Sequence, residues 1–193
     1  MKNKIITISR QYGSGGLKIG KDLADALGCK CYDSSAIRKA ADNISKDASF
    51  TSKDSLAEYD TLLSKLSDSK GYSAHDTLHT AECKVITDLA ASDKPCIIIG
   101  RCADYILKER NDVLRVFLYA PFENRVKRWL SIYDTKSKSP ELLVKTVDVL
   151  RASYYELYTG QKFGAIENYN LCIDTSKVGH DAVVKTILDA FNH

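Results

Sequence analysis

Residues 4–28, KIITISRQYGSGGLKIGKDLADALG, are the stretch that decides the fold class. Residues 4–9 are rich in β-branched side chains and are bounded by polar ones, which predicts a short buried strand. Apolar side chains then recur at helical spacing from Leu17 to Leu27, and Gly28 follows where a helix commonly ends. A strand, a glycine-rich loop and a helix are therefore predicted in this order.

The glycine-rich loop is predicted to bind phosphate. Glycines adopt backbone conformations that let successive N–H groups point into one concavity, and the N-terminus of the following helix adds positive charge. A plain turn is the alternative, since glycine also suits tight connections. The candidate phosphate-binding residues are Gly13, Ser14, Gly15, Gly16 and Leu17.

The same alternation continues to the end of the chain. Further strands are predicted at residues 30–32, 96–100, 113–119 and 170–174, with helical patterns among and after them. Strands that alternate with helices predict an α/β domain with a parallel sheet, helices on both faces and ligands at the carboxyl ends of the strands. One domain is expected over residues 1–193, with a helical insertion at about 43–74 and a mobile lid at about 131–151.

Length and composition narrow the classes of function. With 193 residues, 44% hydrophobic and 27% charged, the chain has the composition of an ordinary globular protein of one domain. Its net charge of +3 is too small for bulk binding to nucleic acid or to a membrane. No apolar run approaches the roughly 20 residues of a membrane span, and no signal peptide is recognised. A cytoplasmic protein with reduced cysteines is therefore expected.

The loop matches the phosphate-binding pattern G-x-x-x-x-G-K-[ST] in spacing but not in every residue. Arg10 stands where the first glycine belongs, Gly16 where the lysine belongs, and Leu17 where the magnesium-binding hydroxyl belongs. The missing charge is expected from Arg10 or Lys18, and an arginine suits phosphate because its fork binds two oxygens at once. The dinucleotide pattern G-x-G-x-x-G fits less well, since Lys18 replaces its third glycine.

Several segments together resemble the cytidylate kinase-like family of P-loop proteins, relatives of the nucleoside monophosphate kinases. They are residues 6–37 (ITISRQYGSGGLKIGKDLADALGCKCYDSSAI), 97–104 (IIIGRCAD), 115–128 (RVFLYAPFENRVKR), 148–151 (DVLR) and 169–175 (YNLCIDT). The resemblance covers nearly the whole chain. It implies a three-layer P-loop kinase fold, ATP at the glycine loop, and a nucleoside monophosphate or another small phosphate acceptor across the cleft.

The resemblance also implies which charged residues form the site. Phosphoryl transfer needs several cations around the transferring group. The candidates for this catalytic role are Arg10, Lys18, Arg101, Arg125, Arg128 and Arg151. The candidates for contact with the acceptor are Asp33, Ser34, Arg38, Lys39, Arg101, Asp104 and Asp148.

Some of these residues have a simpler alternative role. Ser34 can cap its helix, and Arg151 can pair with Asp148 three residues earlier on a helix. Arg125 and Arg128 can lie on the surface of their helix, where arginines are common. The sequence leaves these alternatives open.

Departures from the family pattern concern Mg²⁺. Relatives carry an aspartate before the Gly-Arg pair, where this chain has Ile99, and another after it, where this chain has Cys102. Asp104 follows two residues later, and Leu17 offers no hydroxyl. No protein ligand for a metal is assigned, and any Mg²⁺ is expected to be coordinated mainly by nucleotide and water.

Two other classes of function stay open. A nucleotide-sensing or scaffold protein that kept the fold and lost turnover is favoured by the missing lysine, hydroxyl and aspartate, whereas the retained arginines favour an enzyme. A sulfotransferase-like enzyme would use a phosphate-binding loop without metal.

Two further clusters are interpreted as structural. His75, His79 and Cys83 have the spacing of one helix face and are interpreted as that face rather than as zinc ligands. The tyrosines at positions 154, 155, 158 and 169 are interpreted as packing between the lid helix and the sheet, with stacking on a base as the alternative.

Overall fold

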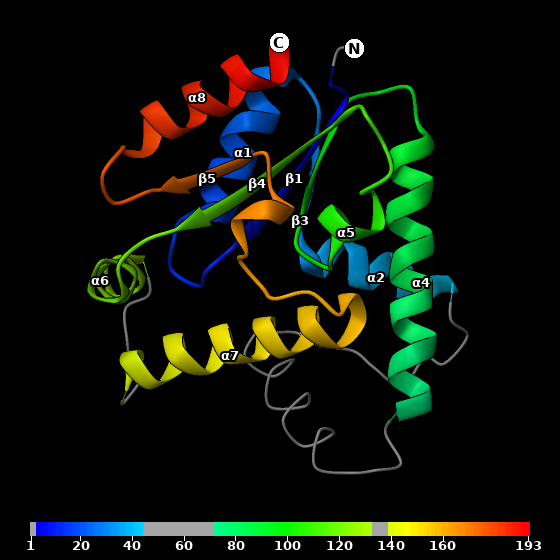
Figure 1. Ribbon diagram of the computed structural model, residues 1–193, viewed down its shortest axis with the longest axis horizontal. Helices are drawn as coiled ribbons and strands as arrows, with labels where there is room; N and C mark the ends of the chain where they lie inside the picture. The colour runs from blue at the N-terminus through cyan, green and yellow to red at the C-terminus, as the bar shows by residue number, and fades with distance from the viewer. Residues whose placement is uncertain (1–2, 45–71, 133–138) are drawn as a thin grey trace.

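The computed structural model describes residues 3–44, 72–132 and 139–193 (Figure 1). Its strands are β1 (Ile5–Arg10), β2 (Lys30–Tyr32), β3 (Cys96–Ile99), β4 (Val113–Tyr119) and β5 (Leu171–Asp174). Its helices are α1 (Gly16–Leu27), α2 (Ser34–Ile44), α4 (Tyr72–Ala91), α5 (Ala103–Ile106), α6 (Phe122–Ile132), α7 (Pro140–Thr159) and α8 (His180–Asn192), with the 3-10 turn η1 (Ile166–Asn168). Every predicted strand is present, and its ends differ from the prediction by one residue at most.

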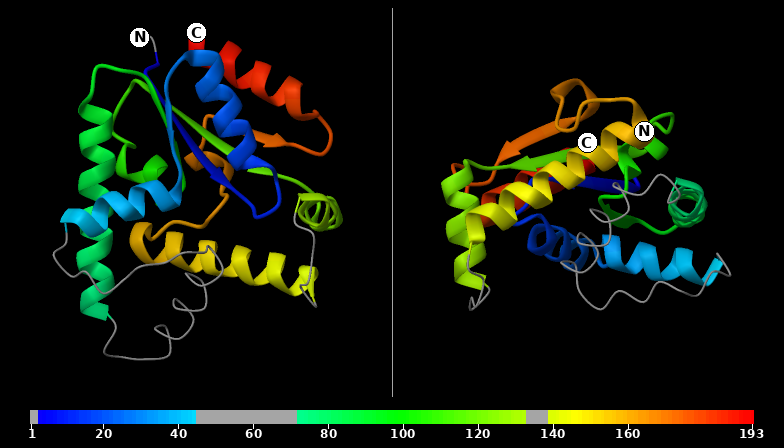
Figure 2. Two further views of the ribbon diagram at one scale, coloured as in Figure 1. Left: turned by 180° about the vertical axis from the view of Figure 1, so that it is seen from behind. Right: turned by 90° about the horizontal axis from the view of Figure 1, so that it is seen from below.

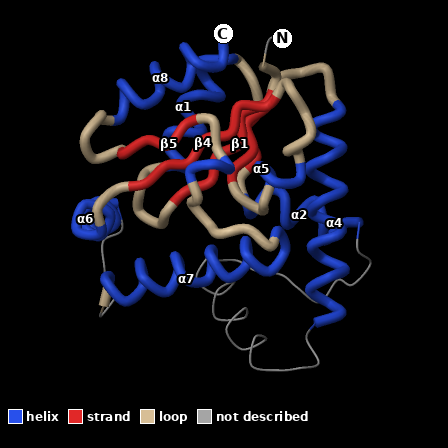
Figure 3. Tube along the Cα trace, in the orientation of Figure 1, coloured by secondary structure: helices blue, strands red, loops and turns tan. Residues whose placement is uncertain are grey.

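The strands form a single parallel sheet in the order β2-β3-β1-β4-β5 (Figure 3). Parallel neighbours need crossover connections, which the helices between the strands supply. Because β1 lies at the centre of the sheet, the loop that follows it opens at the middle of the carboxyl edge. The predicted α/β class with a parallel sheet is confirmed.

Helices cover both faces of the sheet and bury its strands from two sides (Figure 2). On one face, Ile6 of β1 packs in a cluster with Leu23 of α1 and Ile187 of α8. The neighbouring residue Ile5 points to the other face and packs in a second cluster that includes Ile86 of α4. Burial on both faces explains why the strands are continuous apolar runs rather than alternating ones.

Helix α7 runs across the carboxyl edge of the sheet instead of lying on a face (Figure 1). The lid expected at 131–151 comprises the end of α6, residues 133–138, which lie outside the described residues, and the first part of α7. The insertion expected at 43–74 falls mostly on residues 45–71, which also lie outside the described part. The mobility of the lid stays a prediction.

The state of the cysteines and the apolar character of the helices complete the description of the fold. All six cysteines lie within the described residues and carry free thiols. None of the described helices is both long enough and apolar enough to cross a membrane.

Candidate functional site

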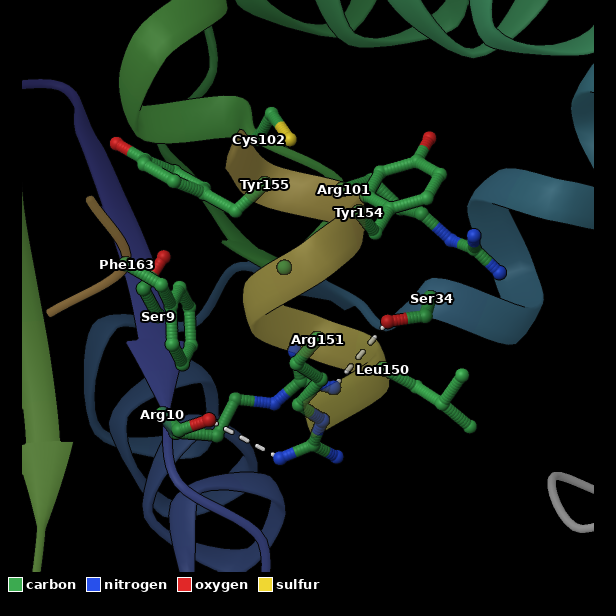
Figure 4. A pocket seen from close by; sticks show the side chains of 11 residues that line it. Ser9, Arg10, Ser34, Arg101, Cys102, Leu150, Arg151, Tyr154, Tyr155 and Phe163 are labelled. Atoms are coloured by element: carbon green, nitrogen blue, oxygen red, sulfur yellow. Dashed lines mark hydrogen bonds between the residues drawn. The ribbon is translucent and has the colours of Figure 1, made fainter. Parts of the chain in front are cut away.

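The carboxyl ends of the strands meet at the edge of the sheet that α7 covers. Parallel α/β sheets bind ligands at this edge, and a pocket lies there between β1, α2 and α7 (Figure 4). Among its lining residues are Ser34 and the predicted arginines Arg10, Arg101 and Arg151. The sheet therefore brings together candidates from four distant parts of the sequence.

The glycine loop has the backbone conformation that the phosphate-binding prediction requires. Gly13 and Gly15 have φ angles of +80° and +88°, in the left-handed region that favours glycine. A Cβ at Gly13 would lie 2.6 Å from the backbone oxygen of Arg125, so a side chain does not fit there. Within the described residues, the N–H groups of Gly15, Gly16 and Leu17 at the start of α1 have no hydrogen-bond partner. Such N–H groups are available to an anion.

Side chains from α6 and from the end of β5 hold the carbonyl groups of the same loop. Arg125, Arg128 and Thr175 donate hydrogen bonds to the carbonyl oxygens of residues 12–14, at distances of 2.9, 3.2 and 2.9 Å. These bonds fix the path of the loop backbone. The structure thus gives Arg125 and Arg128 contacts with the loop itself rather than positions on the helix surface.

Arg125 is also the centre of a buried ion pair. Only 7% of its side chain is exposed, and its guanidinium pairs with the carboxylate of Asp148 on α7. The other oxygen of Asp148 accepts the N–H of Tyr12 at 2.7 Å. Asp148 therefore ties α7 to both α6 and the loop, and its ion-pair partner is Arg125 rather than Arg151.

The side chain of Arg10 passes over Gly16, the position at which a complete P-loop carries its lysine. A Cβ at Gly16 would lie only 3.0 Å from Cγ of Arg10, so a side chain at position 16 and the arginine compete for one space. The Arg10 guanidinium donates a hydrogen bond to the Ser34 hydroxyl at 3.2 Å, and Arg151 donates to the Arg10 carbonyl at 3.0 Å (Figure 4). The stem of Arg10 thus lies beside the loop, and its guanidinium lies in the pocket beside Ser34 and Gly100.

Lys18, the other candidate for the loop cation, is engaged elsewhere. Its ammonium lies 2.6 Å from the carboxylate of Asp22 and 3.3 Å from the ring of His180 on α8. Its side chain is 70% exposed. These partners hold Lys18 along the outside of α1.

The acceptor candidates at the start of α2 and along it have separate roles in the structure. The carboxylate of Asp33 accepts the N–H of Ala36 at 2.9 Å and caps the helix. Ser34 is therefore not the cap; its hydroxyl donates to the carbonyl of Ile99 at 3.2 Å and lines the pocket. Lys39 is exposed on the same helix.

The chain turns sharply after β3. Gly100, Arg101 and Cys102 have φ angles of +79°, +55° and +56°, and such conformations cost about 1–3 kcal/mol at each non-glycine residue. This turn directs the side chain of Arg101 toward α2, away from Arg10 and Arg151 (Figure 4). The predicted arginines thus form separate groups around the pocket and the loop rather than one cluster.

Sequence analysis missed a buried carboxylate, Glu82 on α4, which is 1% exposed. The Tyr154 hydroxyl donates to its Oε2 at 2.7 Å, and its Oε1 lies 3.4 Å from Nε of Arg101 and 3.9 Å from Nη1 of Arg38. Burial raises the pKa of Glu82 to about 7, although the Tyr154 hydrogen bond and the charge of Arg38 lower it.

A signal for Glu82 was present in the sequence. Val85 and Ile86, three and four positions further along α4, are both buried, so Glu82 falls within the apolar stripe of its helix. A glutamate at such a position is rarely buried unless it is paired. The pattern predicts a buried partner but does not reveal which residue it is.

Asp104 is the second buried carboxylate of this edge. The Ser9 hydroxyl donates to one of its oxygens at 3.1 Å, and the Tyr155 hydroxyl donates to the other at 2.7 Å. Burial raises the pKa of Asp104, while these two hydrogen bonds lower it. Both carboxylate oxygens are thus already bonded within the protein.

The donor set around the loop does not fit a Mg²⁺ ion held by the protein. Asp104 is enclosed, and Leu17, at the position of the metal-binding hydroxyl, is apolar and 45% exposed. Among residues 3–44, 72–132 and 139–193, no group of three or more His, Cys, Asp or Glu side chains is placed to hold a metal.

The predicted packing holds for Tyr155 and Tyr169, whereas Tyr154 and Tyr158 contact α4 instead of the sheet. Tyr155 and Tyr169 are buried, with Phe163 and Phe117 as their respective ring neighbours. His79 of α4 stacks on Tyr158, and its Nε2 lies 3.4 Å from the thiol of Cys83. The side chain of His75 lies outside the described part.

Comparison with known proteins places this architecture among the P-loop kinases. The sequence profile of the cytidylate kinase-like family matches residues 5–177, and the chain therefore belongs to this family. The cytidylate kinase of Halobacterium salinarum is 25% identical over 187 residues, which are 96% of this chain and 88% of that protein.

Solved structures support the fold. A protein from Eubacterium ventriosum superposes with a TM-score of 0.74 at 22% identity and covers 97% of both chains. Shikimate kinase from Acinetobacter baumannii, solved with shikimate, has a TM-score of 0.55 at 18% identity, over 98% of this chain and 92% of that one. The three-layer P-loop kinase fold predicted from the sequence is confirmed.

Proposed function

We propose that this chain transfers a phosphoryl group from ATP to a nucleoside monophosphate, with a cytidylate-like acceptor as the first candidate. The observation that carries the proposal is the position of Arg10, whose side-chain stem passes over Gly16 of the glycine loop and whose guanidinium lines the pocket at Ser34. A cation at this place can neutralise charge on a phosphoryl group that passes from one side to the other. Membership of the cytidylate kinase-like family supports the same reaction class.

In this proposal the donor binds at the loop and the acceptor binds in the pocket. The N–H groups at the start of α1 hold the phosphates of ATP, and Arg125 and Arg128 keep the loop in shape. Arg10 and Arg151 face the transferring group, and Ser34, Arg38 and Arg101 belong to the acceptor side. The chain's own residues bind and orient the two nucleotides; Mg²⁺, coordinated by nucleotide and water, would supply further charge neutralisation.

The pocket must widen before an acceptor can enter it. The space in the pocket amounts to about 70 Å³, well below the roughly 300–1,000 Å³ of sites that enclose a small-molecule ligand. Because α7 forms one wall, a movement of α7 away from α2 would enlarge the pocket. This is the role expected of a lid.

A nucleotide-binding protein without turnover is the second candidate. It is favoured by Gly16, Leu17 and the enclosed Asp104, because none of them supplies a cation or a metal ligand. An assay with ATP, Mg²⁺ and a panel of monophosphates (CMP, dCMP, UMP, AMP and GMP) separates the two by detecting nucleoside diphosphates. Formation of a diphosphate from one acceptor supports the kinase, whereas binding without any diphosphate supports the second candidate.

Replacing Gly15 with valine is expected to abolish the heat of ATP binding in isothermal titration calorimetry. A β-branched residue is strained at φ +88°, and its Cβ would lie 3.2 Å from Nη1 of Arg128. The matched control is Gly28→Val at the other end of α1, where φ is +59° and nothing lies within 4 Å of an added Cβ. This control should bind ATP like the wild type. Equal heats of ATP binding for wild type and Gly15→Val would contradict the assignment of ATP binding to the loop.

A further inference from the structure

Glu82 joins two arginines that come from different elements. Arg38 lies on α2 and Arg101 in the turn after β3, yet both approach the same carboxylate oxygen, at 3.9 and 3.4 Å. Oε1 of Glu82 is buried and, within the described residues, accepts no hydrogen bond. Its partners are therefore the two positive charges.

The burial of both arginines makes a carboxylate between them favourable. The side chains of Arg38 and Arg101 are 11% and 8% exposed. Two guanidinium groups so far out of water repel each other and lose hydration, and a buried anion between them offsets both effects. Without Glu82, this compensation by a buried carboxylate would be lost.

Glu82 and its two arginines adjoin the wall of the pocket. Arg101 and Tyr154 line the pocket, whereas Glu82 does not. Glu82 contacts both of them: its Oε1 lies beside Arg101, and its Oε2 accepts the hydroxyl of Tyr154 at 2.7 Å. The guanidinium of Arg101 lies 5.5 Å from the centre of the Tyr154 ring, which further limits its movement.

We propose that Glu82 is a positioning residue that holds Arg38 and Arg101 in place for the phosphate of the acceptor monophosphate. The inference rests on the proposed function, since it assigns Glu82 to the acceptor side of that site. Glu82 acts through the two arginines and does not touch the substrate. The strained turn at Arg101 and the carboxylate behind it together determine where the guanidinium lies.

Steady-state kinetics of Glu82→Gln tests the proposal, because glutamine keeps the size of the side chain and removes its charge. An interaction that is equal in the ground state and the transition state affects KM and leaves kcat unchanged. The KM for the monophosphate should rise about tenfold or more, which corresponds to roughly 1.4 kcal/mol. The KM for ATP and kcat should stay within about twofold of the wild type, whereas general damage to the fold would change all three.

Asp42→Asn is the matched control. Asp42 is a second carboxylate beside that arginine: it lies 3.6 Å from Nε of Arg38 and is more exposed than Glu82. Its removal should leave the KM for the monophosphate within about twofold of the wild type. If Glu82→Gln does not fold, Glu82→Asp replaces it, because the shortened carboxylate should raise the same KM and leave the KM for ATP unchanged.

The outcomes distinguish this proposal from the function on which it rests. Wild-type turnover with an unchanged monophosphate KM in Glu82→Gln would overturn the role of Glu82 alone. Equal increases in both KM values would overturn it as well, because they indicate a structural role. A wild-type protein that neither binds nor phosphorylates any monophosphate would overturn the proposed function, and the role of Glu82 with it.

Discussion

An Arg10→Ala variant is expected to lose ten- to one-hundredfold in kcat/KM for phosphoryl transfer. Arg10 supplies the cation at the end of β1. Its side-chain stem passes over Gly16, where the loop lacks its lysine, and its guanidinium lies at Ser34. A charge-assisted hydrogen bond contributes about 1.5–3 kcal/mol, and each 1.4 kcal/mol is a factor of about ten. The measurement is a coupled assay with ATP and the preferred monophosphate.

Two further variants identify the source of the charge. Lys18→Ala should change kcat/KM by about twofold at most, because the ammonium of Lys18 is already paired with Asp22 on the outside of α1. Arg10→Lys should recover only part of the loss, since an ammonium cannot bind two oxygens as a guanidinium does. If Arg10→Ala is as active as the wild type while Lys18→Ala is inactive, the helix and not the strand supplies the cation.

An Asp148→Ala variant is expected to lower the free energy of unfolding by about 3 kcal/mol, the lower end of the range for breaking a buried ion pair. The lower end applies because the Asp148 side chain is 23% exposed. The substitution leaves the buried guanidinium of Arg125 without its counter-charge and the N–H of Tyr12 without its acceptor. At about 2–4 °C per kcal/mol for a chain of this size, the thermal midpoint should fall by roughly 6–12 °C.

The control for Asp148 is Asp88→Ala. Asp88 pairs with Lys84 on the exposed side of α4, with both side chains about 60% exposed, and such surface pairs contribute only about 0.3–0.5 kcal/mol. The thermal midpoint of Asp88→Ala should stay within about 2 °C of that of the wild type. An Asp148→Ala variant with an unchanged midpoint and a raised KM for the monophosphate would contradict the structural role and assign Asp148 to the acceptor instead.

The fold could be predicted from the sequence because its signals are local. Three neighbouring patterns specify a strand, a loop and a helix without reference to the rest of the chain. They are the β-branched run from Ile5, the glycine-rich loop at residues 13–16 and the apolar spacing up to Leu27. The carboxyl edge as the place of the site followed from the parallel sheet alone. The identity of most charged candidates came from the family resemblance.

The directions of the side chains could not be predicted, because distant contacts decide them. Arg101 was expected among several cations around one transferring group; it lines the pocket, but a turn with positive φ and the carboxylate of Glu82 direct its side chain toward α2. Ser34 was open to a capping role until the structure assigned the cap to Asp33. Arg125 holds a loop more than one hundred residues away in sequence. The spacing of residues along one helix does not predict contacts between residues on different elements.

In the proposed reaction, the chain moves a phosphoryl group from ATP to a nucleoside monophosphate. The most direct test is a phosphorus NMR time course of the wild-type protein with ATP, Mg²⁺ and an equimolar mixture of CMP, UMP, AMP and GMP. The account predicts that the signals of ADP and of one nucleoside diphosphate grow at equal rates while the γ-phosphate signal of ATP falls, with no free phosphate formed. Unchanged ATP, or release of free phosphate with every monophosphate intact, would contradict it.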